Sequence, residues 1–337
     1  MKAIRIHEPG DIRVLRYEEV DIPEPGVGEV RVRLRAAGVN HRDIWVRQGN
    51  FGPMAEPVIP GSDGAGEVDA IGAGVRRWSV GQKVVINPGL ACGTCSACLS
   101  GDHPACQSFS IYNGTYAEYA VVPEENVVSM PGGLTFAEAA SIGVPYVTAE
   151  DFLMRSRALP GQTLLLWGAT GGLGVATLQL AKLRGMRVIA VTRNAARSEK
   201  LRQYGADEVA VIGGEKTVVE TVSALTGGQG ADIVVDSVGQ ASFPQSLDAV
   251  RRGGVIVTVG STTGGQVSFE LGQLFRSRIT LLGAFMGSGS ILPRILPLFS
   301  RGVLVPVIDS TYPLEQADQA HEQMENHGVF GKIILTM

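Results

Sequence analysis

The middle of the chain alternates short apolar runs with segments of helical spacing, and this alternation constrains the fold most. The apolar runs span 164–167, 187–191, 209–212, 233–236, 255–259 and 279–285. The segments with helical spacing span 172–184, 198–204, 216–225, 243–251 and 271–276. Apolar strands that alternate with helices are typical of an α/β domain whose parallel sheet is covered on both faces. Six such strands predict two mononucleotide-binding halves.

A glycine-rich turn follows the first of these strands and opens the first helix. Glycines permit a tight turn and let the backbone approach a pyrophosphate, whose charge is favoured at a helix N-terminus. A glycine turn without a ligand is the alternative, but the place of this turn at the head of the strand series favours a dinucleotide site. The expected cofactor-binding residues here are Gly168, Thr170, Gly171, Gly172, Leu173 and Gly174.

The end of the second strand indicates which dinucleotide binds. NAD enzymes usually place Asp or Glu about 20 residues after the glycine turn, on the ribose diol. This chain has Thr192, Arg193 and Asn194, followed by Arg197 and Lys200. No acid is present to repel a 2′-phosphate, and guanidinium groups bind phosphate well. NADP(H) is therefore the predicted cofactor, and an ordinary solvated loop is the alternative.

All four cysteines of the chain lie within fifteen residues. Cys92, Cys95, Cys98 and Cys106 have the spacing C-x2-C-x2-C-x7-C. Four closely spaced thiolates fill the tetrahedral shell of a zinc ion and leave no position for water or substrate. One structural zinc is the prediction, and two disulfides or an iron site are the alternatives. The start MKAIRIHEPG has no basic-then-apolar leader, so disulfides and secretion are not expected.

The first part of the chain reads as β-rich. Short alternating segments at 2–7, 14–18, 29–36, 64–71, 83–86 and 116–122 are separated by Pro/Gly turns, which predicts a small β-barrel or sandwich. A tail helix at 314–326 and a strand at 332–335 are expected to fold back onto this first domain. A net charge of −4 gives no sign of a nucleic-acid surface. The apolar stretch at 279–285 is too short to cross a membrane, so a cytoplasmic protein is expected.

Four motifs together resemble the medium-chain dehydrogenase/reductase superfamily over the whole length. They are GATGGLG after a strand, the four-cysteine lobe, PGSDGAGEV at 60–68 and GKIIL at 331–335. The resemblance implies a GroES-like domain with the cysteine lobe, formed by residues 1–145 and 287–337. It also implies a Rossmann NADP-binding domain at 146–286, with the active-site cleft at their junction.

The same resemblance implies that a second metal site has lost its donors. Zinc alcohol dehydrogenases of this family hold a catalytic zinc with Cys, His and Cys. Those positions are Asn40, Ser62 and Val144 here, and Asp63 replaces a neighbouring glutamate. Since Asn, Ser and Val offer neither thiolate nor imidazole, no catalytic zinc is expected.

The lost ligands change the expected reaction. Quinone-oxidoreductase-like and enoyl-reductase-like branches also lack them and transfer hydride from NADPH to an electron-poor C=C bond or a quinone. An NADPH-dependent reduction of an enone, an enoyl thioester or a quinone is therefore the leading hypothesis. An alcohol dehydrogenase or carbonyl reductase is the second. A non-enzymatic NADPH-binding protein is the third, because the fold alone does not establish an activity.

The resemblance also implies roles for single residues. Asn40 and Thr148 would hold the nicotinamide half, and the backbone around Phe285 would bind its carboxamide. Gly260 and Ser261 would close the fifth strand on the same edge of the sheet. The catalytic candidates are Asn40, Ser62 and Tyr146, with His41 as a further proton donor or a purely positional residue.

Two more expectations concern packing. Asp43 is expected to be a buried carboxylate that pairs with a nearby arginine such as Arg47. The sixth strand at 279–285 is apolar and ends one edge of the sheet, so it is expected to pair with its symmetry mate in a homodimer or homotetramer.

Overall fold

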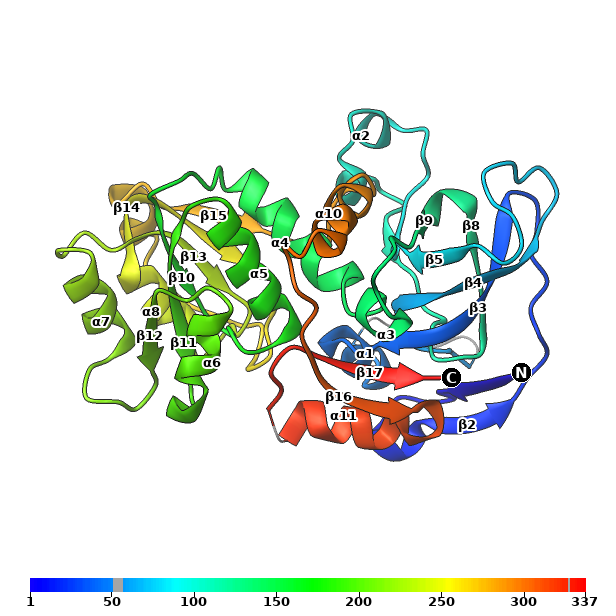
Figure 1. Ribbon diagram of the computed structural model, residues 1–337. Coiled ribbons are helices and arrows are strands. Elements are labelled where there is room, and N and C mark those ends of the chain that lie inside the picture. Colours follow the sequence, from blue (N-terminus) through cyan, green and yellow to red (C-terminus); the bar gives the residue numbers. More distant parts are fainter. Residues whose placement is uncertain (51–56, 327) are drawn as a thin grey trace. The chain divides into compact units, whose positions relative to one another are not determined.

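The chain folds into two compact units, seen here in a computed structural model that describes residues 1–50, 57–326 and 328–337. Unit 1 consists of Met1–Val147 and Ser288–Met337, and unit 2 of Thr148–Gly287 (Figure 1). The sequence predicts the two changes of domain at 145/146 and 286/287, and the structure divides at 147/148 and 287/288.

Unit 2 contains one six-stranded sheet whose neighbouring strands are all parallel. Its order is β12-β11-β10-β13-β14-β15, the doubly wound order of the Rossmann fold. Leu164, Leu165 and Leu166 follow one another in β10 and are all buried, so both faces of the sheet are covered. The strands are β10 (Thr163–Leu166), β11 (Arg187–Thr192), β12 (Glu208–Val211), β13 (Ala231–Asp236), β14 (Val250–Thr258) and β15 (Thr280–Gly283).

Helices connect these strands, and the predicted helical segments are confirmed with small shifts at their ends. One apolar core joins Val222 of α7 and Leu247 of α8 to Leu165, Ile189 and Ile256 of the sheet. Thr217 caps α7 in a capping box with Glu220, so that helix begins at Val218 instead of 216. The helices are α5 (Gly172–Leu183), α6 (Ser198–Gln203), α7 (Val218–Leu225), α8 (Phe243–Ala249) and α9 (Leu271–Arg276).

Two element ends in unit 2 differ from the prediction. The helix predicted to reach 251 stops at Ala249, because Val250 is extended and already pairs with Ala231 in the sheet. The strand predicted to reach 285 ends at Gly283. Met286 then adopts a φ of 61°, a left-handed conformation that a strand does not allow.

Unit 1 is built on a seven-stranded sheet of order β16-β17-β3-β4-β5-β9, with β8 also paired to β3. The tail returns to the first domain as predicted, since Leu335 of β17 pairs with Ala37 of β3. The strands of unit 1 are β1 (Lys2–Arg5), β2 (Arg16–Glu19), β3 (Glu29–Gly38), β4 (Asp63–Ile71), β5 (Lys83–Ile86), β6 (Gly89–Leu90), β7 (Ser110–Ile111), β8 (Tyr119–Pro123), β9 (Val127–Ser129), β16 (Ile308–Pro313) and β17 (Lys332–Thr336).

Strand β3 is the centre of this sheet because its side chains alternate. Val30, Val32 and Leu34 are buried in one core, which also includes Val84 and Val122. The end of β3 enters a second core with the tail, where Ala37 packs among residues of β17 and α11. A period of two is the strand signal, so this element was predictable.

Several helices of unit 1 were not predicted. The largest of those that lie wholly in unit 1 is α10, whose run ILPRILPLFS contains Pro293 and Pro297 and therefore lacks a helix-forming composition. Tertiary burial of Ile291, Ile295 and Phe299 along one face stabilises it instead. The helices that were not predicted are α1 (His41–Arg47), α2 (Ser96–Leu99), α3 (Phe136–Ala139), α10 (Ile291–Ser300) and α4 (Gly143–Arg155), which carries the chain into unit 2. The predicted tail helix at 314–326 is confirmed as α11 (Ala317–Asn326).

Within the described ranges, no helix has both the length and the apolar character that a membrane span requires.

Candidate functional site

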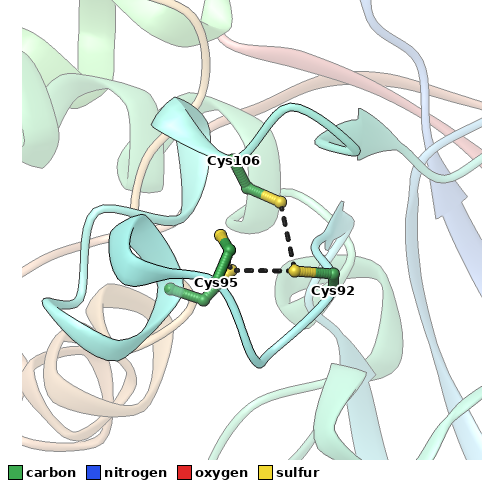
Figure 2. Close-up of side chains that lie close together, drawn as sticks. Cys92, Cys95 and Cys106 are labelled. Atoms are coloured by element: carbon green, nitrogen blue, oxygen red, sulfur yellow. Dashed lines mark hydrogen bonds between the residues drawn. The ribbon is translucent and has the colours of Figure 1, made fainter.

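The four cysteine sulfurs converge in one loop of unit 1. The Sγ atoms of Cys92 and Cys98 are 3.9 Å apart, those of Cys95 and Cys98 3.6 Å, and those of Cys106 and Cys92 3.6 Å. Figure 2 shows the thiols of Cys92, Cys95 and Cys106 gathered in this loop. All four thiols are free, which excludes the two disulfides considered from the sequence.

This geometry fits a tetrahedral metal. Four sulfurs that each lie about 2.3 Å from a central zinc are about 3.8 Å from one another. The observed separations match that spacing, and all four ligand atoms lie within 4.8 Å of one another. No open position remains, so a zinc ion here would be structural. Over residues 1–50, 57–326 and 328–337, this is the one group of three or more potential metal ligands that converges.

The thiols themselves differ in acidity. Backbone amides of Thr94 and Cys95 lower the pKa of the Cys92 thiol to about 6. Burial, followed by the hydrogen bond from Cys95, raises the pKa of the Cys98 thiol to about 12. A divalent cation would hold both as thiolates, because its charge favours the deprotonated ligand.

The cysteine lobe is attached to the segment that re-enters unit 1. His103, three residues before Cys106, has its Nδ1 3.0 Å from the Ser288 hydroxyl, and the Gly289 amide donates to the same nitrogen. The Asn87 amide donates to the Gly289 carbonyl at 2.8 Å. These bonds fix the lobe to the segment at 288–289.

The glycine turn of unit 2 lies between β10 and α5. Gly168 has a φ of 68°, which other residues rarely adopt, and Gly171 is the N-cap of α5. A Cβ on Gly174 would overlap backbone atoms of Gly168 and Ala169, so only glycine lets the helix pack this closely on the turn. Thr170, Gly172 and Leu173 are half-buried in the same turn. The turn thus presents helix amides at the carboxyl end of the central strand β10, where chain order reverses.

The other predicted cofactor residues of unit 2 follow neighbouring strands on the same edge. Thr192 ends β11 and is buried, its hydroxyl bonded to the amide of Asn194, while Arg193 is exposed. Asn194 caps the next turn through the Ala196 amide. The residues after β14 and β15 are Gly260 and Ser261, and Phe285. Parallel strands end on one edge of a sheet, so the fold brings these segments to the edge where dinucleotides bind.

Thr148 lies at the start of unit 2 and is buried. Its hydroxyl is 3.8 Å from the Met286 sulfur, beside the left-handed turn that follows Phe285. The amide of Ala284 donates to the carbonyl of Thr258, so this amide is used in pairing β15 with β14. The structure therefore brings Thr148 and the 284–286 segment together, and their binding of the nicotinamide stays a prediction.

Two of the three positions that the resemblance matches to zinc ligands, Asn40 and Val144, belong to a buried hydrogen-bonded cluster in unit 1. The Lys332 ammonium donates to Asn40 Oδ1 at 2.7 Å and pairs with Asp63 Oδ2 at 3.0 Å. The Asn40 amide nitrogen donates to the same Asp63 oxygen, and Asp63 Oδ1 accepts from the amide of Val144 at 2.7 Å. The side chains of Lys332 and Asp63 are 5% and 0% exposed. This donor set does not fit a zinc ion, because its oxygens already serve an internal cation and its amides.

Ser62, the third of these positions, is held by an arginine. Arg42 Nη1 donates to Ser62 Oγ at 3.0 Å and to Asn113 Oδ1 at 2.6 Å, and Nη2 donates to the Ile111 carbonyl at 3.1 Å. Burial lowers the pKa of Arg42 from its ordinary value, and the neighbouring Asp43 charge opposes this. The guanidinium thus lies one hydrogen bond from Ser62, one of the three positions at which the resemblance places a zinc ligand.

Asp43 is fully buried and forms an ion pair with a nearby arginine, as expected, but that arginine is Arg42, at 4.0 Å, and not Arg47. Asp43 Oδ2 also accepts from the Asn40 amide at 2.8 Å and from the Tyr116 hydroxyl at 3.0 Å. Arg47 bonds Glu325 of α11 at 2.9 Å. Arg47 is not the partner because α11 comes from the distant tail and offers Arg47 a carboxylate that the local sequence does not contain.

Burial perturbs the acidity of this network. It raises the pKa of Asp43 to about 6 and lowers the pKa of His321 to about 3. Tyr116 connects the two groups, since its hydroxyl also lies 3.2 Å from His321 Nε2. Burial also lowers the pKa of His41, which favours its neutral form. The network stabilises the end of β3 and the start of α1.

Tyr146 packs inside unit 1. Its hydroxyl donates to the Val305 carbonyl at 3.2 Å, and its ring meets the edge of Phe299 on α10 at a centroid distance of 4.9 Å. The expected catalytic role of Tyr146 therefore stays a prediction.

Sequence reasoning gave no role to Lys332 or Arg42. A lysine at the start of the strand KIILT, directly before three apolar residues, is the signal that could have found Lys332, because buried lysines need a partner. Arg42 follows Asn40 by two residues in the sequence. Only the fold shows that the Arg42 side chain reaches Ser62.

Comparisons with known proteins agree with this architecture. Residues 26–132 match the family described as alcohol dehydrogenase GroES-like domain, and residues 172–301 match the family described as zinc-binding dehydrogenase. A quinone oxidoreductase of Rattus norvegicus is 30% identical and covers 100% of this chain and 98% of its own length. An alcohol dehydrogenase of Geobacillus stearothermophilus is 32% identical, with 100% and 99% covered. An acryloyl-coenzyme A reductase of Metallosphaera sedula is 31% identical, and the match covers 100% of both chains.

Solved structures show the same fold. A crystal structure of an NAD-dependent alcohol dehydrogenase superposes with a TM-score of 0.95 at 39% identity, over 100% of both chains. The Escherichia coli quinone oxidoreductase in complex with NADPH superposes with a TM-score of 0.87 at 25% identity, also over 100% of both chains. With its GroES-like domain, its nicotinamide-type Rossmann sheet and its full-length relatives, the chain belongs to the medium-chain dehydrogenase/reductase superfamily of oxidoreductases.

Proposed function

We propose that this protein is an NADPH-dependent reductase of activated C=C bonds, such as those of enones and enoyl thioesters, or of quinones, and that it works without a catalytic metal. One observation carries the proposal. The positions of the zinc ligands, Asn40, Ser62 and Val144, lie around an internal Lys332–Asp63 ion pair and offer no soft donor.

The energetics of the reaction support this choice. Reduction of a plain ketone builds an alkoxide, which needs a strong electrophile such as zinc. Reduction of a conjugated substrate spreads the developing charge over an enolate or a hydroquinone, so hydrogen bonds suffice. The relatives named quinone oxidoreductase and acryloyl-coenzyme A reductase fit the same chemistry.

The cofactor would bind on unit 2. The turn at Gly168–Gly174 would hold the pyrophosphate, and Arg193 and Asn194, with Thr192 in place of an acid, would accept the 2′-phosphate of NADP(H). When bound, the reduced nicotinamide supplies the hydride. NADPH-bound neighbours in the family support NADP(H), whereas the relative of known structure at 39% identity is an NAD-dependent alcohol dehydrogenase.

An alcohol dehydrogenase is the second candidate, because several relatives carry that name. A panel of substrates separates the two. NADPH oxidation is followed with cyclohexenone, crotonyl thioesters, a benzoquinone and saturated aldehydes, and NADP⁺ reduction with ethanol and benzyl alcohol. Each assay is run with and without a rapid chelator. We expect turnover with the conjugated acceptors that the chelator leaves intact, and brisk alcohol oxidation abolished by chelation would contradict the proposal.

The cofactor preference has its own test in Arg193→Ala. Loss of one charge-assisted contact to the 2′-phosphate should weaken NADPH binding by about ten- to a hundred-fold and leave NADH binding unchanged. Dissociation constants from fluorescence titration measure this. Arg202→Ala is the matched control, because Arg202 pairs with Glu199 on the surface of α6. Equal affinities of the wild type for NADPH and NADH would remove the NADP(H) proposal.

We also propose that the protein forms a homodimer or homotetramer through β15. This strand is the edge of the unit 2 sheet, and Leu281 and Phe285 near it are exposed. An apolar sheet edge readily pairs with a symmetry mate. A monomeric mass by light scattering at micromolar concentration would refute this.

A further inference from the structure

Strand β13 of unit 2 ends in a buried carboxylate, that of Asp236. This residue is the last of the strand and is 1% exposed. Its two oxygens lie within hydrogen-bond distance of two backbone amides and two serine hydroxyls, all of them in unit 2. Burial of a carboxylate costs free energy unless its oxygens are bonded, so these donors show which parts of the unit Asp236 holds.

The two oxygens of the carboxylate hold different parts of the unit. Oδ1 accepts from the amides of Val238 and Gly239 at 2.9 and 3.0 Å, so it fixes the loop that follows the strand. Oδ2 accepts from the hydroxyls of Ser242 and Ser246 at 2.8 and 2.7 Å. Ser242 is the N-cap of α8 and Ser246 lies one turn further along the helix, and the Ser242 hydroxyl is also 2.7 Å from Oδ1. Oδ1 is therefore bonded mainly to the loop, and Oδ2 to the helix.

The loop that Oδ1 fixes, residues 237–239, packs against the glycine turn. The Ser237 hydroxyl donates to the carbonyl of Trp167, which directly precedes the turn, at 3.4 Å. A Cβ on Gly168 would overlap the same hydroxyl, so only a glycine lets the turn and the loop approach this closely. A displaced loop would therefore also displace the turn.

The same loop is bonded to the segment that follows β14. The Val238 carbonyl accepts from the Thr263 amide at 2.9 Å and from the Thr263 hydroxyl at 2.8 Å. A Cβ on Gly260 would lie only 3.0 Å from the Ser237 carbonyl, so the two backbones are in close contact. Gly260 and Ser261 are the residues of this segment that the sequence predicts to bind the cofactor. The loop thus lies between two segments with a predicted role in cofactor binding.

We infer that Asp236 is a positioning residue of the cofactor site. Its Oδ1 atom fixes the loop at 237–239, and this loop holds the glycine turn and the segment at 260–263 in place relative to one another. Asp236 acts through these segments and is assigned no contact with the cofactor itself. The inference rests on the proposed function, because it takes the carboxyl edge of this sheet as the cofactor site, and it applies to NADPH and NADH alike.

The size of the effect follows from preorganisation. Without the carboxylate, the amides of Val238 and Gly239 lose their acceptor, and the loop is no longer restricted to one arrangement. A ligand whose site is assembled for only about a tenth of the time binds about tenfold more weakly. Loss of the carboxylate should therefore weaken cofactor binding without the loss of any direct contact to the cofactor.

The test measures dissociation constants for NADPH and NADH by fluorescence titration of the wild type, Asp236→Ala and Asp236→Asn. Asp236→Ala removes the acceptor of the loop amides and should weaken the binding of both cofactors by about tenfold or more. Asp236→Asn keeps one oxygen that can face these amides, and the Ser242 hydroxyl can donate to the Gly239 carbonyl, 3.1 Å away. Its dissociation constants should therefore stay within about threefold of the wild type.

Ser246→Ala is the matched control for a purely structural role. It removes one hydroxyl from Oδ2 and leaves the bonds between Oδ1 and the loop, so it should lower the melting temperature while both dissociation constants stay within about twofold. Hydrogen exchange gives a second readout that needs no ligand. The amides of Val238 and Gly239 should exchange faster by about tenfold or more in Asp236→Ala, and at nearly the wild-type rate in Asp236→Asn and Ser246→Ala.

Two results would overturn the inference: dissociation constants in Asp236→Ala equal to those of the wild type, or an equal loss of affinity in Ser246→Ala. Should Asp236→Ala not fold, Thr263→Val replaces it, because Thr263 is exposed and its hydroxyl joins the loop to the neighbouring segment. That variant should bind both cofactors about threefold more weakly, and unchanged binding would count against the inference. A wild type that binds neither cofactor would remove the proposed function and this inference with it, so the wild type tells the two failures apart.

Discussion

Two clusters of unit 1 show opposite solutions to the placing of charge in a protein interior. The first contains Cys92, Cys95, Cys98 and Cys106, whose sulfurs lie at the spacing of a tetrahedral metal. The second contains Asn40, Asp63 and Lys332, whose polar atoms are joined to one another by hydrogen bonds and an ion pair. The sulfurs of the first cluster need a metal ion as their partner, whereas the polar atoms of the second cluster are partners of one another.

This contrast shows how the second cluster is held together without a metal ion. Removal of soft donors alone would leave Asp63 buried and without a counter-charge. In this chain Lys332 of the last strand supplies that charge, at 5% exposure. Because the second cluster is complete, the chemistry assigned to it needs a substrate whose own conjugation spreads the developing charge.

The largest effect should come from disrupting the first cluster. Cys98→Ser removes one of four thiolates, so the zinc should be lost and the lobe should unfold locally. We expect a loss on the order of 5 kcal/mol or more, since structural zinc binds zinc-finger peptides with about 10–16 kcal/mol. Zinc content and the thermal midpoint measure this. Ser100→Ala, in the same loop, is the control, and a Cys98→Ser protein with normal zinc and stability would show that the two clusters do not differ in this way.

The second cluster should respond to loss of its cation. Lys332→Met leaves Asp63 buried and unpaired, which should lower the free energy of unfolding by about 3–5 kcal/mol. The double variant Lys332→Met with Asp63→Asn should recover part of that loss, because it removes the orphaned charge. Urea unfolding of the four proteins of this cycle measures the coupling. A cost below about 1 kcal/mol for Lys332→Met would show that the ion pair is not what stabilises this place.

A smaller effect concerns pH. The pKa of Asp43 is raised from 3.8 to about 6, so between these values the folded state binds more protons and its stability falls as pH rises. The pKa of His321 is lowered from 6.5 to about 3, so stability falls as pH decreases through that window. Between about pH 5 and about pH 7.5, deprotonation of Asp43 should lower the free energy of unfolding by about 1 kcal/mol, and deprotonation of His321 should raise it by about 2 kcal/mol.

Urea unfolding at these two pH values separates the two contributions. Relative to the wild type, Asp43→Asn should gain stability as pH rises, and His321→Gln should gain stability as pH falls. Parallel pH profiles for the wild type and both variants would contradict the assigned shifts.

The sequence predicted those parts of the molecule that depend on local pattern. The alternation of strands and helices in unit 2, the glycine turn and the spacing of the cysteines are all encoded within short segments. The contacts that it did not predict join distant segments. Arg47 meets Glu325, and Asn40 meets Lys332, across 278 and 292 residues. Helix α10 was also missed, since burial of one face outweighs its two prolines.

The metal content of the purified protein is the decisive measurement. One closed four-thiolate site and a second cluster without soft donors predict about one zinc per chain, measured by mass spectrometry of the metal against protein concentration, with near zero in Cys98→Ser. Two zinc ions per chain, with one retained in Cys98→Ser, would show that the second cluster binds metal after all and would contradict the metal-independent mechanism.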